Sequence, residues 1–112
     1  MSWRGLGAIT LVLGGCAVDE ADYPAAAAAR SCQQWYKCDR GAFERSYATI
    51  DECTDDEGGV RAGVESALDL ADLLGCSYDP ALAAECLRDV RRSECSDFNV
   101  LEIIGCEAWV CG

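Results

Sequence analysis

Apolar and polar positions follow a helical period over the second half of the chain. The clearest stretch begins at Val60, where apolar side chains recur every three or four residues and charged side chains fall between them. Gly75 is a typical C-terminal stop for this helix. The apolar stripe consists of Val60, Val64, Ala67, Leu68, Ala71 and Leu74.

A second amphipathic helix is predicted over residues 80–93. Asp79 is a favourable N-cap, and Pro80 suits the first helical position because its ring already fixes a helical φ angle. Arginines cluster near the end of this stretch, where positive charge is favoured by the helix dipole. Its apolar stripe consists of Leu82, Cys86 and Val90, with Ala83 and Leu87 beside it.

The first half of the chain predicts a helix that begins near Ala25. Pro24 fits the first turn, and a run of alanines follows, the residue with the highest helix propensity. Gly41 is the expected stop. A flexible low-complexity linker is the alternative for the alanine run. The inner face of this helix would consist of Cys32, Trp35 and Tyr36.

Two shorter elements are expected between these helices and at the end of the chain. Phe43, Tyr47 and Ile50 have the spacing of a short helix or turn under the first helix. The segment 49–52 matches a capping box, which would place Cys53 in the first turn of the next element, before the glycines at 58 and 59 interrupt it. Residues 99–102 could cap a final short helix through residue 110, although β-branched residues there also favour a strand. Together these patterns predict an all-α fold, a small disulfide-stapled helical bundle of three to four helices.

The start of the chain has the layout of an export signal. A basic residue near the N-terminus precedes an apolar run over 5–13, which is too short to span a bilayer, and small residues lead to Cys16. Leu13-Gly14-Gly15-Cys16 matches the lipobox of bacterial lipoproteins. We expect cleavage between Gly15 and Cys16, with lipid on Cys16. The alternative is a buried N-terminal segment with Cys16 in a disulfide.

These boundaries divide the chain into a signal peptide at 1–15, a lipidated tether at 16–24 and a cysteine-rich helical domain at 25–112. Residues 17–24 are acidic and have little to pack. Without the signal, 97 residues remain, enough for one domain. A chain of that size forms a core of modest stability.

The cysteine count supports a special role for Cys16. The chain has nine cysteines, and setting Cys16 aside leaves an even number suited to four disulfides. Such a density is typical of small domains in oxidising compartments. The expected disulfide cysteines are Cys32, Cys38, Cys53, Cys76, Cys86, Cys95, Cys106 and Cys111.

Spacing excludes one of the pairings and leaves the others open. Cys32 and Cys38 cannot bridge along one helix, because six residues separate them by about 9 Å on opposed faces. The remaining cysteines allow many connectivities, which sequence alone does not decide. The pairings that we expect are Cys38 with Cys53, Cys86 with Cys32 or Cys76, and Cys95 with Cys106 or Cys111.

The formal net charge of −11 argues against nucleic-acid binding, which needs a basic surface. It also argues against electrostatic attachment to anionic lipid. Attachment to a membrane would therefore come from acyl chains on Cys16, of which two or more anchor a protein stably. The expected partners are the membrane and an envelope protein of unknown identity.

Recognisable catalytic and metal-binding patterns are missing from the sequence. The chain has no histidine, which excludes Ser-His-Asp and Cys-His nucleophile systems. It has no Cys-x-x-Cys pair of the kind used in redox enzymes or zinc sites. The densest acidic segment, 51–57, fails the calcium-loop pattern and is predicted to be a solvated turn. We expect no metal and no cofactor.

The chain resembles the small cysteine-rich lipoproteins of myxobacteria and related delta-proteobacteria. That resemblance implies lipid on Cys16, and Ala17 in place of aspartate implies passage to the outer membrane. It implies no activity. Plant lipid-transfer proteins and saposin-like proteins have different cysteine arrangements. The resemblance rests on Leu13–Cys16, Cys32–Cys38, Phe43–Cys53 and Asp79–Cys86 through Cys95.

Three functional hypotheses follow. The leading one is a membrane-anchored, non-enzymatic envelope lipoprotein with a structural or interaction role. The second is a small-ligand or lipid-binding module. A core closed by Trp35, Phe43 and Leu68 would leave no room for a ligand and would argue against this hypothesis. The third is an enzyme that uses carboxylates or a thiol. Trp35 and Trp109 are expected in the core rather than as anchors for a partner.

Overall fold

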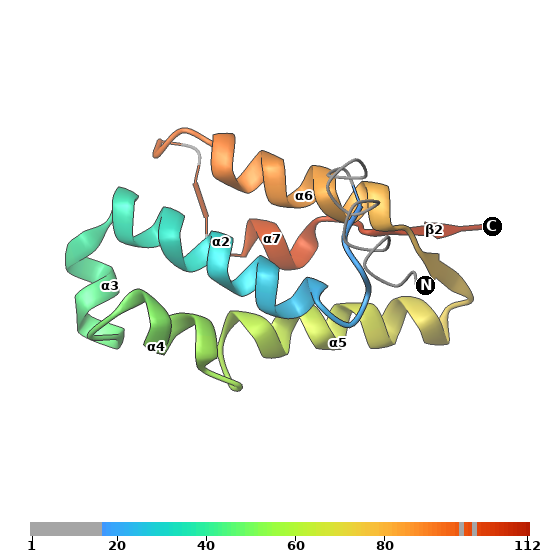
Figure 1. Cartoon of the computed structure of the whole chain (residues 1–112), viewed down its shortest axis with the longest axis horizontal. Coiled ribbons are helices and arrows are strands. Elements are labelled where there is room, and N and C mark those ends of the chain that lie inside the picture. The colour runs from blue at the N-terminus through green and yellow to red at the C-terminus, as the bar shows by residue number, and fades with distance from the viewer. Residues whose placement is uncertain (1–16, 97, 100) are drawn as a thin grey trace, which may run out of the picture.

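Three long helices dominate the computed structural model, which describes residues 17–96, 98–99 and 101–112. They are α2 (Tyr23–Cys38), α5 (Val60–Leu73) and α6 (Pro80–Arg92), and α2 packs against both of the others (Figure 1). Shorter helices connect or follow them. These are α3 (Arg40–Ser46), α4 (Ile50–Asp55) and α7 (Glu102–Gly105).

The caps predicted for α5 and α6 are confirmed. Gly75, just beyond α5, has a φ of +83°, a left-handed conformation that glycine adopts without steric cost. Asp79 caps α6, since its Oδ1 accepts hydrogen bonds from the backbone N–H of Ala81 at 2.9 Å and of Leu82 at 3.1 Å. One residue of the apolar stripe predicted for α5 does not face the core, since Leu74 is 71% exposed.

The first helix forms as predicted, but its end was misplaced. The alanine run is helical, which excludes the flexible linker. Gly41 does not stop α2, because the break comes earlier, at Asp39, and Gly41 lies inside α3. Asp39 is the C-cap of α2 and the N-cap of α3. Its N–H donates to the carbonyl of Trp35 at 2.8 Å, and its Oδ1 accepts from the N–H of Ala42 at 3.1 Å.

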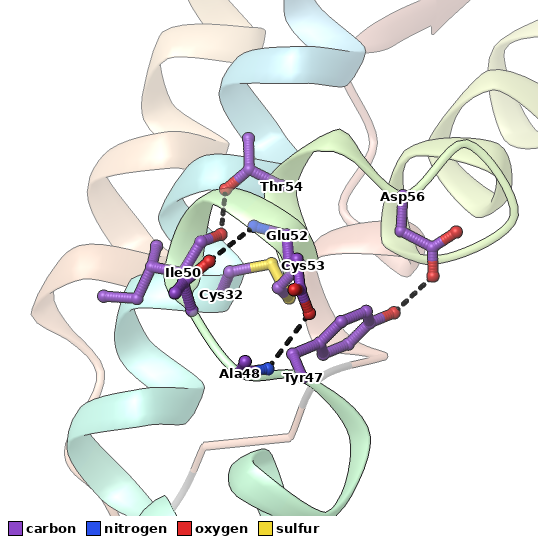
Figure 2. The surroundings of a disulfide bond; sticks show 9 residues. Cys32, Tyr47, Ala48, Ile50, Glu52, Cys53, Thr54 and Asp56 are labelled. Atoms are coloured by element: carbon purple, nitrogen blue, oxygen red, sulfur yellow. Dashed lines mark hydrogen bonds between the residues drawn. A yellow bond between two sulfur atoms is a disulfide. The ribbon is translucent and has the colours of Figure 1, made fainter.

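The capping box at the start of α4 is confirmed with a shift of one residue. The Thr49 Oγ1 accepts a hydrogen bond from the Glu52 N–H at 3.1 Å. The Glu52 carboxylate accepts from the N–H of Ala48 at 3.0 Å, one residue before the N-cap (Figure 2). The cap sets the direction of α4 and thereby places Cys53 against α2.

The all-α prediction is correct for most of the chain but wrong at a small sheet. Strands β1 (Cys76–Tyr78) and β2 (Trp109–Cys111) pair antiparallel, with Cys76 opposite Cys111 and Tyr78 opposite Trp109. The final helix expected to run through residue 110 is therefore only the short α7, which ends at Gly105. The strand alternative holds for the last residues, because β1 offers free backbone groups to pair with them.

The buried side chains form two clusters. The first lies between α2, α5, α6 and α7 and includes Tyr23, Val64, Val90 and Ile103. The second, at the end of the molecule that holds α3 and α4, is built on Cys32, Phe43 and Cys53. Four partly buried side chains pack against that second cluster: Trp35, Tyr36, Tyr47 and Ile50.

The three residues expected to close one core do not meet. Trp35 and Phe43 stack edge to face in the second cluster, with ring centroids 5.4 Å apart, whereas Leu68 belongs to the first. Trp109 packs half-buried against the first cluster. Both tryptophans therefore contact the core, as expected, but each keeps an exposed edge.

Candidate functional site

The eight cysteines between 32 and 111 form four disulfides among the described residues. The expected number of bridges is confirmed, and Cys32 and Cys38 take different partners. The expected pairings are wrong. The observed bridges are Cys32–Cys53, Cys38–Cys95, Cys76–Cys111 and Cys86–Cys106.

The positions of α4 and α6 around α2 explain why the pairings were wrong. Cys32 and Cys38 point from different sides of α2, and α4 covers one side while α6 packs on another. Cys53, at the middle of α4, therefore reaches Cys32 (Figure 2). Cys38, at the last turn of α2, reaches Cys95 just beyond the end of α6. Sequence spacing carries no information about which helix covers which side.

The disulfides differ in burial. Cys32 and Cys53 are fully buried inside the second cluster. Cys86 is buried in the first cluster, with its partner Cys106 packed against it. Cys111, by contrast, is exposed, and its bridge to Cys76 joins the two strands across the sheet.

The segment that follows Cys16 docks on the domain. Gly15 and Cys16 lie outside the described residues, as does the whole predicted signal at 1–15. Two residues later, the N–H of Val18 donates to the carbonyl of Pro80 at 3.3 Å, and the Tyr78 hydroxyl donates to the Val18 carbonyl at 2.6 Å. The expectation that 17–24 has little to pack is therefore wrong at Val18, and also at Tyr23, which is 1% exposed.

A surface groove lies beside this docked segment. Its walls come from Glu20, Asp72, Tyr78 and Trp109, and its volume is about 260 Å³. Burial, and then the negative field of neighbouring acidic groups including Glu20, raises the pKa of Tyr78. Burial alone raises the pKa of Tyr23 to about 12. Both phenols therefore stay neutral at physiological pH, and the charge of the groove comes from its carboxylates.

Within the acidic segment 51–57, the Asp56 carboxylate accepts two hydrogen bonds. The Tyr47 hydroxyl donates to Asp56 Oδ2 at 2.5 Å (Figure 2), and the Gly58 N–H donates to Asp56 Oδ1 at 3.0 Å. These bonds lower the pKa of Asp56, while the hydrogen bond to that carboxylate raises the pKa of Tyr47 to about 12. Within the described ranges, no group of three or more acidic or cysteine side chains is arranged to hold a metal ion.

Several large apolar side chains are exposed at the end of the molecule that carries the sheet. On α5 and just after it, Leu70 is 57% exposed, Leu73 81% and Leu74 71%. Val110 of β2 is 52% exposed. Leu101, which precedes α7, is a separate exposed leucine. Only Leu74 of this group carried a prediction, and that prediction placed it in the core.

Two structural contacts were missed from sequence. Gln34 is 5% exposed, and its Nε2 donates to the carbonyl of Ser93 at 2.7 Å, which fastens the end of α6 to α2. No local pattern marks such a contact between residues so far apart. Val18 did carry a signal, because it is an apolar residue within an acidic stretch.

The part of the chain that the structure describes contains no helix long and apolar enough to cross a membrane. No protein-family model matches the sequence, and searches of curated proteins and of solved structures likewise found no match.

Proposed function

We propose that this protein is a bacterial envelope lipoprotein, held at the outer membrane by lipid on Cys16, with a non-enzymatic structural or interaction role. The lipobox Leu13-Gly14-Gly15-Cys16 behind an apolar segment is the observation that carries the proposal. Cleavage before Cys16 would leave the acylated cysteine as the first residue of the mature protein.

The disulfide pattern supports a separate role for Cys16. All eight of the other cysteines take one another as partners. A disulfide between Cys16 and the domain would require one of these bridges to open. Four disulfides also fit an oxidising compartment outside the cytosol, which is where an export signal would deliver the chain.

The packing favours an interaction role over the ligand-binding alternative. The second cluster is filled by aromatic rings in contact, with Phe43 5.3 Å from Tyr36 and 5.4 Å from Trp35 between centroids. The groove beside Tyr78 and Trp109 lies on the surface. A small domain with filled cores presents its outer surface to a partner. An enzymatic role through carboxylates would need two of them at a set separation in a cleft.

Intact-mass analysis of the protein extracted from membranes tests this proposal. We expect a chain that begins at Cys16, carries three acyl chains and lacks eight thiol hydrogens because of four disulfides. Metabolic labelling with a fatty acid should be lost in Cys16→Ala. It should persist in the matched control Cys111→Ala, which leaves the lipobox intact.

Two results would overturn the proposal. One is a native chain that still begins at Met1. The other is a Cys16→Ala protein that remains labelled and still sediments with membranes. Cross-linking of Cys16 to another cysteine, detected by non-reducing peptide mapping, would support the alternative in which the N-terminal segment is buried.

A further inference from the structure

The end of α5 presents an apolar face to solvent. Leu70, Leu73 and Leu74 have the i, i+3, i+4 spacing that places side chains on one side of a helix, and all three are more than half exposed. Val110 of β2 is exposed at the same end of the molecule. We call these four residues the leucine face. Contiguous exposed apolar surface marks an interaction site more often than chance exposure does.

The length of the tether determines what lies next to this end of the molecule. Val18 is held by hydrogen bonds to Pro80 and Tyr78, and only Ala17 separates it from Cys16. Two residues span at most about 7 Å. If Cys16 carries lipid, as proposed above, its acyl chains leave the bilayer within that distance of Val18. The docked segment and its neighbours must then lie against the membrane surface.

The leucine face belongs to the same neighbourhood. Tyr78, which binds Val18, is the last residue of β1, and β1 follows Leu74 after a single glycine. Glu20 and Asp72 line one groove, which brings the N-terminal segment beside the last turns of α5. In Figure 1 the blue N-terminal segment, the end of α5 and β2 all lie in the right half of the molecule. The second cluster, around α3 and α4, lies at the opposite end.

The charges beside the docked segment are mixed. Glu20 and Asp72 line one groove, whereas Arg30, Arg88 and Arg91 line another together with Val18. Electrostatics therefore does not select between an anionic and a neutral lipid surface. The contribution of the leucine face is the burial of apolar side chains in the membrane interface.

We propose that the leucine face inserts shallowly into the membrane that holds the lipid of Cys16, so that the domain lies in a fixed orientation on the bilayer. This inference rests on the proposed lipidation. The two tryptophans of the mature chain report the orientation, since Trp109 adjoins Val110 and Trp35 lies in the second cluster at the far end.

Quenching of tryptophan fluorescence by brominated lipid tests the proposal. The acylated full-length protein would be reconstituted in phosphatidylcholine vesicles with bromine on the acyl chains close to the headgroup. Trp35→Phe leaves Trp109 as the emitter, and Trp109→Phe leaves Trp35. We expect quenching of Trp109 to exceed that of Trp35 several-fold.

Substitutions within the leucine face should abolish the difference. Leu73→Ser/Leu74→Ser should lower the quenching of Trp109 to the level of Trp35. The control is Leu101→Ser, because Leu101 is also largely exposed, at 64%, but precedes α7, which packs near Gly63 in the first turn of α5. The control should leave the quenching unchanged. Circular dichroism would confirm that each variant is folded.

Separate readouts distinguish failure of this inference from failure of the lipidation. Cosedimentation with vesicles and an acylated mass report the anchor alone. Equal quenching of the two tryptophans in a cosedimenting protein would overturn the orientation and leave the lipoprotein intact. A loss of dimer in Leu73→Ser/Leu74→Ser, measured by sedimentation in detergent without a change in quenching, would assign the face to a second copy of the chain. A protein without acyl mass would overturn both proposals.

Discussion

Among single side chains, Tyr47 and Asp56 make the stability of the loop before α5 depend on pH, through the protonation of the Asp56 carboxylate. The phenol donates to the carboxylate, and the Gly58 N–H donates to the same group. Both bonds favour the charged carboxylate, which is why the pKa of Asp56 is lowered. A group whose pKa is lower in the folded state stabilises the fold above its ordinary pKa. That contribution disappears as the pH falls through the lowered value.

We therefore expect Asp56→Asn to lower the urea midpoint at neutral pH but not in acid. The ordinary pKa is 3.8, so the difference from the unmodified protein should shrink below that pH, where the carboxylate of the unmodified protein also becomes protonated. Urea unfolding followed by circular dichroism at several pH values measures it. In a Tyr47→Phe background the substitution should have a smaller effect. An equal midpoint difference at all pH values would contradict the coupling.

A second residue-scale contact joins α5 to α7 at Gly63. A methyl group at Gly63 would lie 2.5 Å from Ile104 Cδ1, which is too close for two carbon atoms. Alanine in a helix interior is otherwise more favourable than glycine by about 1 kcal/mol. The gain in helix propensity and the displacement of Ile104 therefore oppose each other.

We predict that substitutions at positions 63 and 104 have non-additive effects on the free energy of unfolding. Gly63→Ala alone should change the free energy of unfolding little or lower it. In an Ile104→Ala background, which removes Cδ1 and also the Cγ1 atom that would lie 3.1 Å from the methyl group, the same substitution should stabilise the protein, with a coupling energy above about 0.5 kcal/mol. Urea unfolding of the four proteins of the double-mutant cycle measures this coupling. Additive effects would mean that Ile104 adapts without cost.

At the scale of elements, the start of α6 depends on one carboxylate. Asp79 accepts hydrogen bonds from two backbone N–H groups that have no other helical partner. Asp79→Ala should lower the free energy of unfolding by about 1 kcal/mol. Asp79→Asn keeps an oxygen acceptor and should retain most of that stability. Thermal and urea unfolding of both variants distinguish a cap from a general effect of charge, since a charge effect would make the two variants equal.

Two of the disulfides allow the contributions of packing and of chain entropy to stability to be compared. Cys32–Cys53 and Cys76–Cys111 span 21 and 35 residues. Chain entropy alone gives contributions of about 3.3 and about 3.8 kcal/mol, so it predicts a larger loss for the second pair. The first pair is fully buried, and its removal also leaves a cavity that adds about 1 kcal/mol. Packing should therefore reverse the order.

We expect Cys32→Ala/Cys53→Ala to destabilise the protein more than Cys76→Ala/Cys111→Ala. The second pair joins β2 to β1, and Cys111 is exposed, so loss of this bridge should loosen β2 and leave the helices intact. Urea unfolding gives the order, and hydrogen exchange shows where protection is lost. A larger loss for the second pair would mean that chain entropy dominates.

The elements that could be predicted are those with local signals. The period of the apolar side chains indicates both α5 and α6. Gly75 marks the end of α5, and Asp79 with Pro80 marks the start of α6, so these signals all lie within a few residues of the helices that they indicate. The end of α2 was misplaced because Asp39 acts in two helices at once, which neither helix alone indicates. β2 could not be derived, because its strand conformation depends on pairing with β1, more than 30 residues away.

The candidate site depends still more on distant contacts. That eight cysteines pair follows from their number, but their partners depend on which side of α2 each neighbouring helix covers. Docking of Val18 depends on Tyr78 and Pro80, some 60 residues further along the chain. The exposure of the leucine face was not predicted. Leu74 continues the apolar stripe of α5 in the sequence, although the core ends before it.

For the molecule as a whole, the disulfides are expected to decide whether the chain folds. Each bridge contributes about 2–4 kcal/mol, whereas the net stability of whole domains is about 5–15 kcal/mol. Incubation with a thiol reductant at neutral pH should therefore abolish the cooperative thermal transition and most of the helical circular dichroism signal. Cys76→Ala/Cys111→Ala without reductant is the control and should keep both. A fully reduced protein that still melts cooperatively would contradict this prediction.

The order of the bridges along the chain has a consequence for biogenesis. Among the eight cysteines of the domain, no two that are consecutive in the sequence are partners. A chain that emerges from a translocation pore with its N-terminus first presents Cys32 and Cys38 together, well before Cys53 and Cys95 arrive. If the chain is exported as proposed, oxidation in order of emergence would join the wrong sulfurs, and we expect maturation to require a thiol–disulfide isomerase that reshuffles early bonds.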